Sequence, residues 1–189
     1  MELKDRSFLL VDIETTGFDE KKHQILEIGM LAIKDMDIIA SMNIALKHKE
    51  YTVTTSAMKA NKINLIEHEK NALTLDEAGT TILKFFQDHN ETEKGFIPIG
   101  QNVEFDLRFL EAMFLKIGKI KEYREYVSYR KLDIMQLALI KNLEGKIQLE
   151  KQDLDYLLNS LNIDIPDYRH RALGDCQLEY EVLKRLLTL

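Results

Sequence analysis

The stretch FLLVDIETTGFD, Phe8–Asp19, joins a buried strand to two acidic side chains. The continuous apolar run before the acids is typical of a strand that is covered on both faces. Asp12 and Glu14 are two residues apart, and such side chains point to the same face of a strand. Two carboxylates in one partly buried place repel each other, and one tends to take up a proton unless a cation lies between them. The stretch therefore predicts a site for Mg²⁺ or Mn²⁺, the cations that suit hard oxygen ligands.

These residues have two other interpretations. Asp-x-Glu is a weak pattern on its own, because acidic turn residues often follow strands. The letters DIETTG also match the first half of an EF-hand calcium loop, but position 12 of that loop would be His23 rather than glutamate. A strand rather than a helix precedes the motif, so we exclude an EF-hand.

The composition is that of a globular protein. The chain has 189 residues, of which 45% are hydrophobic, and two prolines give little punctuation between domains, so one domain over residues 1–189 is expected. We find no apolar run of about 18 residues and no signal peptide, and a single cysteine fits a reducing compartment. These features predict a cytoplasmic protein without a membrane partner. The net charge of −6 argues against a protein that coats nucleic acid, but not against an enzyme that holds cations.

The order of the elements predicts an α/β fold with a mixed sheet flanked by helices. Short connections between the first three strands favour an antiparallel meander. The strands are expected at Ser7–Ile13, Ile25–Lys34, Asp37–Leu46 and Gly95–Gly100. Helices are expected at 75–89, 103–118, 132–141, 154–163 and 172–187, with Asn102 as an N-cap and with Cys176, Tyr180, Leu183 and Leu187 on one face of the last.

Two further acids and a histidine occur near helix starts. Asp106 lies in NVEFDLRFL, although an isolated aspartate there often serves only the helix dipole. Asp175 begins the last helix, and His170 precedes it by five residues in HRALGD. Histidine side chains are suited to proton transfer near neutral pH, although a lone histidine in a loop often has no catalytic role. The other four histidines are predicted to be surface residues.

DIETTG, NVEFDLRFL and HRALGD, in this order, resemble the three motifs of the DnaQ-like 3′–5′ exonucleases, in the subgroup that has a histidine in the third motif. The resemblance covers about Ser7 to Leu187. It implies a ribonuclease H-like fold with a mixed five-stranded sheet whose first three strands are antiparallel. It also implies that two Mg²⁺ or Mn²⁺ ions are bound by Asp12, Glu14, Asp106 and Asp175, with His170 as general base. Tyr168 would take the place of His170 as the third-motif residue only if the alignment of this motif were shifted.

The resemblance further implies substrate contacts after the first motif, in ANKINLI and in the second motif, at Thr15, Thr16, Gly17, Ile63, Asn102 and Phe105. Lys62 and Asn64 depart from the residues that are usual beside the apolar contact. Phe105 is also compatible with core packing, and Thr16 with a plain turn.

The implied reaction removes nucleoside 5′-monophosphates from a nucleic acid with a free 3′ end, with single-stranded DNA favoured. RNA is an alternative substrate, because recognition of the 2′-hydroxyl depends on pocket geometry. A non-catalytic binding or polymerase-associated role is the alternative from another class, and nothing in the sequence supports a polymerase partner.

The segment Lys116–Lys131, KIGKIKEYREYVSYRK, is locally basic and carries three tyrosines. Interleaved basic and aromatic residues can bind a single strand. The leading interpretation of this segment is a solvated helix face. Binding of a single strand and contact with a protein are the two alternatives.

Overall fold

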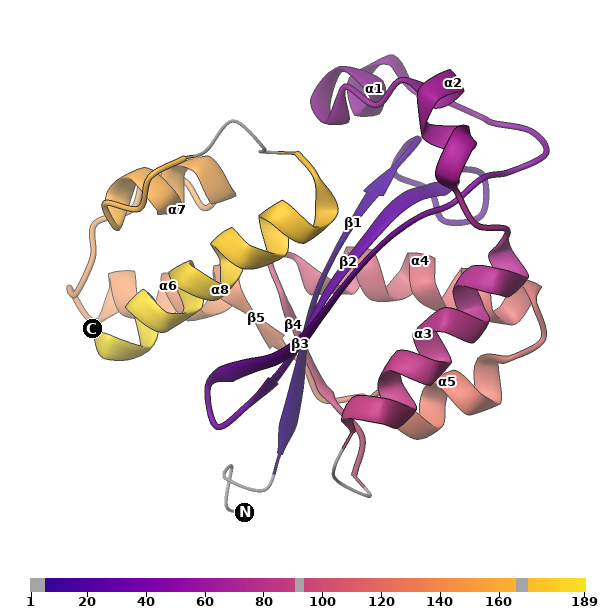
Figure 1. The fold of residues 1–189 in the computed structure, drawn as a ribbon. Helices are drawn as coiled ribbons and strands as arrows, with labels where there is room; N and C mark the ends of the chain where they lie inside the picture. The colour runs from indigo at the N-terminus through magenta and orange to yellow at the C-terminus, as the bar shows by residue number, and fades with distance from the viewer. Residues whose placement is uncertain (1–5, 91–93, 166–169) are drawn as a thin grey trace.

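The computed structural model describes residues 6–90, 94–165 and 170–189 (Figure 1). Five strands form one mixed sheet in the order β3-β2-β1-β4-β5. Strands β1, β2 and β3 are antiparallel neighbours, whereas β4 and β5 run parallel to β1. The strands are β1 Ser7–Thr15, β2 Ile25–Lys34, β3 Asp37–Ala45, β4 Ile97–Gly100 and β5 Leu132–Asp133. The expected five-stranded mixed sheet with an antiparallel first half is confirmed.

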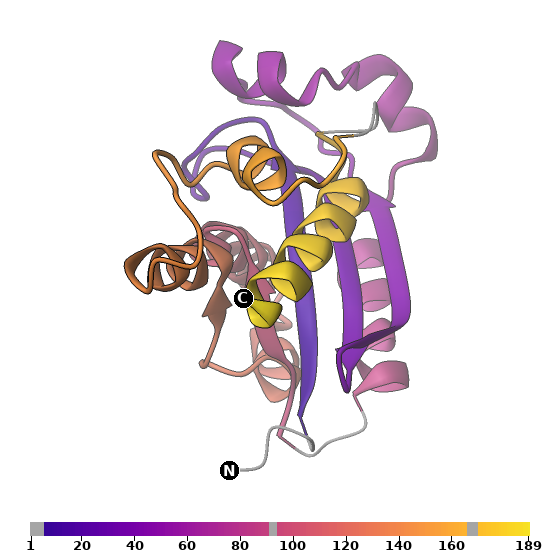
Figure 2. The same ribbon diagram turned by 90° about the vertical axis from the view of Figure 1, so that its left-hand side faces the viewer.

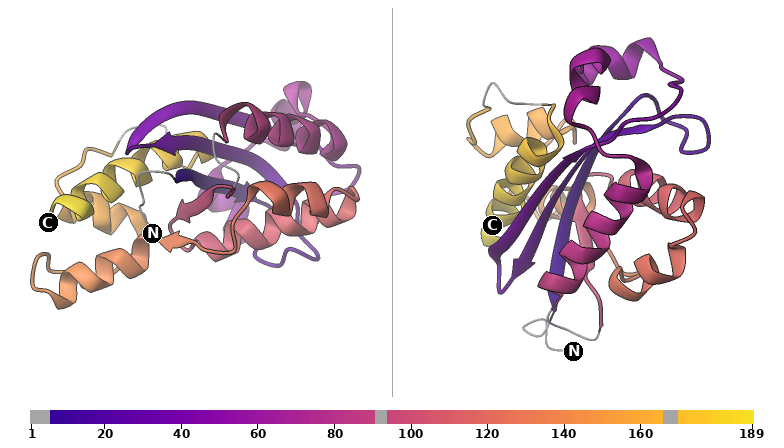
Figure 3. Two further views of the ribbon diagram at one scale, coloured as in Figure 1. Left: turned by 90° about the horizontal axis from the view of Figure 1, so that it is seen from below. Right: turned by 45° about the vertical axis from the view of Figure 1, so that its right-hand side comes forward.

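Helices cover both faces of this sheet (Figures 1 and 3). Alternate residues of β1 enter two separate cores: Leu9, Val11 and Ile13 pack on the side of α3, α4 and α5, and Leu10 packs on the side of α6, α7 and α8. The helices are α1 Thr55–Asn61, α2 Leu65–His68, a 3-10 turn Glu69–Asn71, α3 Leu75–His89, α4 Val103–Lys116, α5 Ile120–Tyr126, α6 Ile134–Leu143, α7 Leu154–Ser160 and α8 Ala172–Thr188.

Several predicted boundaries were wrong. Leu132 and Asp133 form β5, which pairs with Ile99 and Gly100, and the helix begins only at Ile134. On α8 the expected apolar face is buried except for Leu187, which is 50% exposed because it lies in the last turn. The helices at 55–61, 65–68 and 120–126 were not predicted as elements.

Strand β1 extends beyond its neighbour β4. Only Phe8, Leu9 and Leu10 pair with β4, so the edge of β1 that faces β4 has no strand partner from Val11 onward. The first turn of α4 reaches this edge, where the side chain of Asp106 hydrogen-bonds the backbone of Ile13. No helix within the described ranges is long and apolar enough to cross a membrane.

Candidate functional site

Asp12 and Glu14 lie on the part of β1 that extends past β4. Both side chains are half-buried, and Asp12 is opposite Gly29 of β2. By the alternation of the strand they point to the same face as Leu10, which is the face covered by α8. The Oδ2 atom of Asp12 is buried and has no hydrogen-bond partner among the described residues. Such an atom calls for a ligand, because an unpaired buried polar group destabilises the fold.

Asp106 comes to the same place from α4. Its side chain is only 4% exposed, and its Oδ1 accepts a hydrogen bond of 3.1 Å from the backbone N–H of Ile13. That N–H belongs to the stretch of β1 that has no pairing with β4. The carboxylate of Asp106 therefore replaces a strand partner, which fixes α4 against β1 and places the acid beside Asp12 and Glu14.

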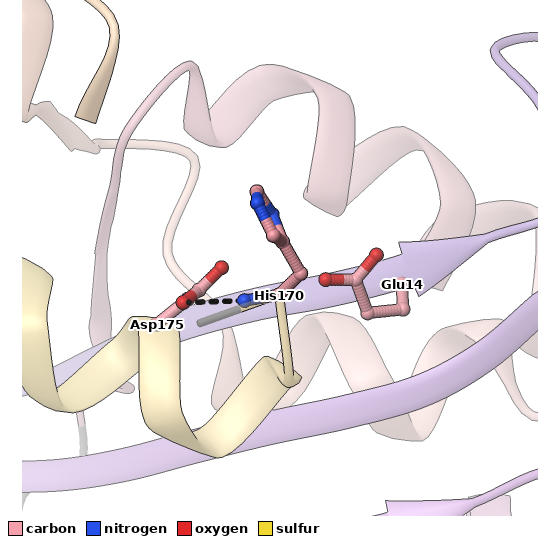
Figure 4. Close-up of side chains that lie close together, drawn as sticks. All are labelled: Glu14, His170 and Asp175. Atoms are coloured by element: carbon pink, nitrogen blue, oxygen red, sulfur yellow. Dashed lines mark hydrogen bonds between the residues drawn. The ribbon is translucent and has the colours of Figure 1, made fainter. Parts of the chain in front are cut away.

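Asp175 lies in the first turn of α8, and His170 directly precedes Arg171, the N-cap of this helix. Asp175 is 5% exposed, and its Oδ1 accepts a 3.3 Å hydrogen bond from the backbone N–H of His170 (Figure 4). His170 has a left-handed backbone with φ of 65°, which turns the chain sharply into the helix. Potential ligand atoms of Glu14, His170 and Asp175 all lie within 4.8 Å of one another.

Two contacts with β2 hold the start of α8 in position. Arg171 donates from Nε to Glu27 Oε2 at 2.9 Å and from a terminal nitrogen to Oε1 at 2.6 Å. Glu27 is 2% exposed, and hydrogen bonding to it raises the pKa of Arg171. Gly29 touches the backbone of Ala172 and Leu173 so closely that a Cβ atom would lie 2.3 Å from the carbonyl carbon of Ala172. Both contacts adjoin His170, so they set its place relative to β1 (Figure 2 shows α8 against the sheet).

The site is strongly acidic. Burial is the main cause of a pKa well above the usual range for Asp12, and the charges of Glu179, Asp106, Glu14 and Asp175 add to it. Burial also raises the pKa of Asp106 well above its usual range, against the opposing effect of backbone hydrogen bonds. Each of these carboxyls is harder to ionise than a solvated one, and a cation among them would reverse that effect.

The chemistry of this donor set fits a divalent cation. Asp12 offers an unpartnered buried oxygen, and Glu14, Asp106 and Asp175 offer further carboxylate oxygens from three different elements. Hard oxygen ligands of this kind are typical of Mg²⁺ and Mn²⁺.

Comparison with known proteins identifies the family. The profile of a family described as "Exonuclease" matches residues 9–183 of the chain. The chain belongs to this exonuclease family. The exonuclease-family match spans all three motifs, and the fold of the chain is DnaQ-like and ribonuclease H-like.

Curated relatives of this exonuclease-family chain include longer and similar-sized proteins. It is 27% identical over 187 residues to a PolC-type DNA polymerase III of Thermotoga maritima. The aligned residues make up 98% of this chain but only 12% of the polymerase. It is also 27% identical over 194 residues to a probable oligoribonuclease of Dictyostelium discoideum, and the alignment covers 96% of this chain and 88% of the oligoribonuclease. Among solved structures, Escherichia coli exonuclease I in complex with a dA16 oligonucleotide matches with a TM-score of 0.79 and 18% identity, covering 97% of this chain and 41% of that one.

The roles of the residues predicted to touch substrate stay predictions, and the structure buries three of them, Thr15, Thr16 and Gly17. The hydroxyl of Thr15 donates to Gly17 O at 2.7 Å, and that of Thr16 donates to Gln24 at 3.1 Å. Gly17 allows close approach, since a Cβ atom there would lie 2.3 Å from the ring of His23.

The other predicted contacts come from separate elements. Ile63 is half-buried between α1 and α2. Asn102 is exposed and is the N-cap of α4, but its left-handed backbone, with φ of 55°, differs from the extended backbone of a usual N-cap, and its side chain makes no capping hydrogen bond. Its backbone N–H donates to Asp133 Oδ1 at 3.2 Å. The Phe105 ring lies 4.9 Å from that of Phe109 and 6.4 Å from that of Phe18, so it packs against the core.

Sequence reasoning missed two buried polar residues near the site. Glu179 is 2% exposed on α8, and its Oε2 accepts the backbone N–H of Gln101 at 3.2 Å. Its spacing of four residues from Asp175 was the available signal, because both lie on one helix face. Asn61 is 4% exposed and donates to Thr15 O at 3.0 Å, which joins the end of α1 to β1.

The other four histidines, His23, His48, His68 and His89, were predicted as surface residues, and all four are half-buried. The rings of His48 and His68 each hydrogen-bond a backbone carbonyl, at 2.7 and 3.0 Å. Tyr168 lies outside the described residues.

Proposed function

We propose that this chain is a metal-dependent 3′–5′ exonuclease that hydrolyses terminal phosphodiester bonds and releases nucleoside 5′-monophosphates. The observation that carries the proposal is the convergence of Asp12, Glu14, Asp106, Asp175 and His170 from β1, α4 and the start of α8, with a buried unpartnered oxygen among them. Membership of the exonuclease family supports it.

The four carboxylates would hold two Mg²⁺ or Mn²⁺ ions, which would supply charge stabilisation to the water oxygen that attacks the phosphorus and to the 3′ oxygen of the remaining strand that leaves. The imidazole of His170 accepts the proton of the attacking water. Asp175 keeps the backbone of His170 turned toward β1 through the 3.3 Å hydrogen bond, and Arg171 anchors the next residue to β2. Thr15, Gly17 and Ile63 would contact the terminal nucleotide, as the resemblance of the first motif and of ANKINLI implies.

Single-stranded DNA is the favoured substrate in this proposal. The E. coli exonuclease I of similar fold was crystallised with a DNA oligonucleotide, which supports that choice. RNA is a second candidate, because the chain aligns with 88% of the length of the probable oligoribonuclease. The PolC-type relative is much longer than the chain, so a polymerase is the first partner to test for.

We also propose that residues 1–189 form one domain, because both cores are built on the same sheet.

The deciding experiment is a gel assay with matched single-stranded DNA and RNA, labelled at either the 3′ or the 5′ end, in Mg²⁺, Mn²⁺ or EDTA. The proposal predicts that 3′ label leaves as mononucleotide from the start, that 5′-labelled product shortens stepwise, and that EDTA stops both. Release of 5′-labelled mononucleotide first, or cleavage that persists in EDTA, would contradict it.

A further inference from the structure

A groove of about 650 Å³ runs along the side of α4 that faces away from the site. Its other walls are α5 and the segment 127–131, which leads into β5. Glu104, Arg108 and Glu111 of α4 line it, at the spacing of one helix face, whereas Asp106 of the same helix reaches β1. The groove and the candidate active site are therefore two sides of one helix.

The groove is positively charged although the chain carries a net charge of −6. Six cations line it, against three carboxylates, Glu104, Glu111 and Glu125; the cations are Arg6, Lys94, Arg108, Arg124, Arg130 and Lys131. Glu104 is paired with Lys131, and Glu111 with Arg124 at 3.6 Å. Arg108 is 3.9 Å from Glu20, a carboxylate that does not line the groove, so Arg6, Lys94 and Arg130 carry the positive excess. The excess of positive charge attracts anions to this face of the molecule.

Two buried donors of the groove lack partners among the described residues. Arg6 is 3% exposed, and its Nε has no hydrogen-bond acceptor, although a terminal nitrogen donates to Lys94 O at 3.4 Å. Tyr123 is 2% exposed, and its hydroxyl is also unpartnered. Buried donors without acceptors are costly, and a guanidinium fork matches the oxygens of a phosphate. The floor of the groove is thus suited to an anionic oxygen ligand.

The outer wall of the groove presents an aromatic ring. Tyr129 is 83% exposed, and the guanidinium of Arg130 lies 5.1 Å from its ring centroid. Of the three tyrosines in the basic segment, Tyr123 is buried and Tyr126 packs against Phe86, so Tyr129 is the one available for a ligand. An exposed ring beside cations is the arrangement on which nucleobases stack while the backbone is neutralised.

We propose that this groove binds the single strand upstream of the cleaved 3′ end, with phosphates along the cations and a base on Tyr129. The inference rests on the proposed function, since it gives the substrate of that site a second contact. Nucleic acid is favoured over a protein partner because one ligand would satisfy the buried donors, the cations and the ring together.

The test compares wild type with Tyr129→Ala, Arg130→Glu and Arg124→Glu, and with Arg185→Glu on the far side of the sheet as a matched control. All four side chains are exposed, so the variants should fold. The substrates are 3′-labelled single-stranded DNA of about 20 nucleotides, longer than one binding groove, and a trinucleotide that cannot reach from the site along α4.

The expected signature is a rise of about tenfold in the KM for the long strand relative to the trinucleotide in each groove variant. The slope of log KM against log salt should also fall by about 0.7 for each phosphate that a variant no longer neutralises. The control should match wild type. An unchanged ratio, or an equal rise for both substrates, overturns the proposal.

Failure of the proposed function looks different. If wild type cleaves neither substrate, the groove is tested by fluorescence anisotropy with the labelled long strand alone. Weaker binding in the groove variants than in Arg185→Glu then supports the groove, and equal binding overturns it, which would direct the search to a protein ligand.

Discussion

Replacing Gly29 with alanine puts a methyl group between β2 and the start of α8. The added Cβ would lie 2.3 Å from the carbonyl carbon of Ala172 and 2.4 Å from the backbone nitrogen of Leu173. Carbon atoms pack at about 3.5–4.0 Å, so the two elements must separate by about 1 Å. Backbone atoms line this contact, so no flexible side chain can move away instead.

The separation displaces His170 and Asp175 from the acids of β1, because both precede or begin α8. A misplacement of about 1 Å costs roughly 10²-fold in rate, and we expect a fall of that size in kcat for Gly29→Ala. Overpacking also destabilises by about 1–3 kcal/mol. For a chain of this length each kcal/mol lowers Tm by about 2–4 °C.

The assay measures kcat on 3′-labelled single-stranded DNA and Tm by circular dichroism. Two glycine controls separate stability from geometry. In Gly79→Ala the methyl group meets the flexible end of Ile117, away from the site, and in Gly118→Ala it meets nothing within 4 Å and only the positive φ is strained. Both should keep kcat, and Gly118→Ala should lose stability. A Gly29→Ala enzyme within about threefold of wild-type kcat, far short of the 10²-fold fall, would refute the claim that this contact positions the site.

Other substitutions probe the remaining groups of the site. His170→Ala should lower kcat by about 10²–10⁴-fold and leave Mn²⁺ affinity, measured by calorimetry, nearly unchanged; a missing Mn²⁺ site would make His170 a ligand instead. Asp106→Ala should destabilise the fold by about 1–3 kcal/mol more than Asp106→Asn, because asparagine keeps an acceptor for Ile13; equal urea midpoints would contradict this. Asp12 has a raised pKa in the fold, so metal-free protein loses stability as pH rises above the ordinary value of 3.8. Asp12→Asn should therefore have a higher Tm than metal-free wild type near neutral pH and an equal Tm below pH 3.8, and a lower Tm near neutral pH would oppose the electrostatic account.

The long elements were predictable because their patterns are strong. Strand β1 is a continuous apolar run, and α3 carries a capping box at Thr74 and Glu77. The short elements were not, because local sequence does not specify them. Helices α1 and α2 have seven and four residues and begin with side-chain caps from Thr54 and Asn64. Strand β5 has two residues and exists only through its pairing with β4.

The acids and the histidine of the site were predictable from motifs, whereas their supports were not. In the sequence, Glu27 is one acid in an apolar strand, and Arg171 is equally suited to a phosphate or a surface acid. Their ion pair joins positions that are 144 residues apart in the sequence, and local sequence patterns do not predict contacts over such a separation. The spacing of Glu179 from Asp175 places both acids on one helix face, but its partner Gln101 lies 78 residues away, and that contact was not predictable.

The gathering of charges at the end of a core strand has a structural reason. Strand β4 stops while β1 continues, which leaves an edge amide of Ile13 that needs an acceptor. The acceptor is the carboxylate of Asp106, so a group placed for chemistry also completes the hydrogen bonding of the sheet. The cost is a cluster of acids whose pKa values are raised by burial and mutual repulsion. A fold that tolerates this cluster without cations gains from binding them, which ties the stability of the domain to the ligands that its proposed reaction needs.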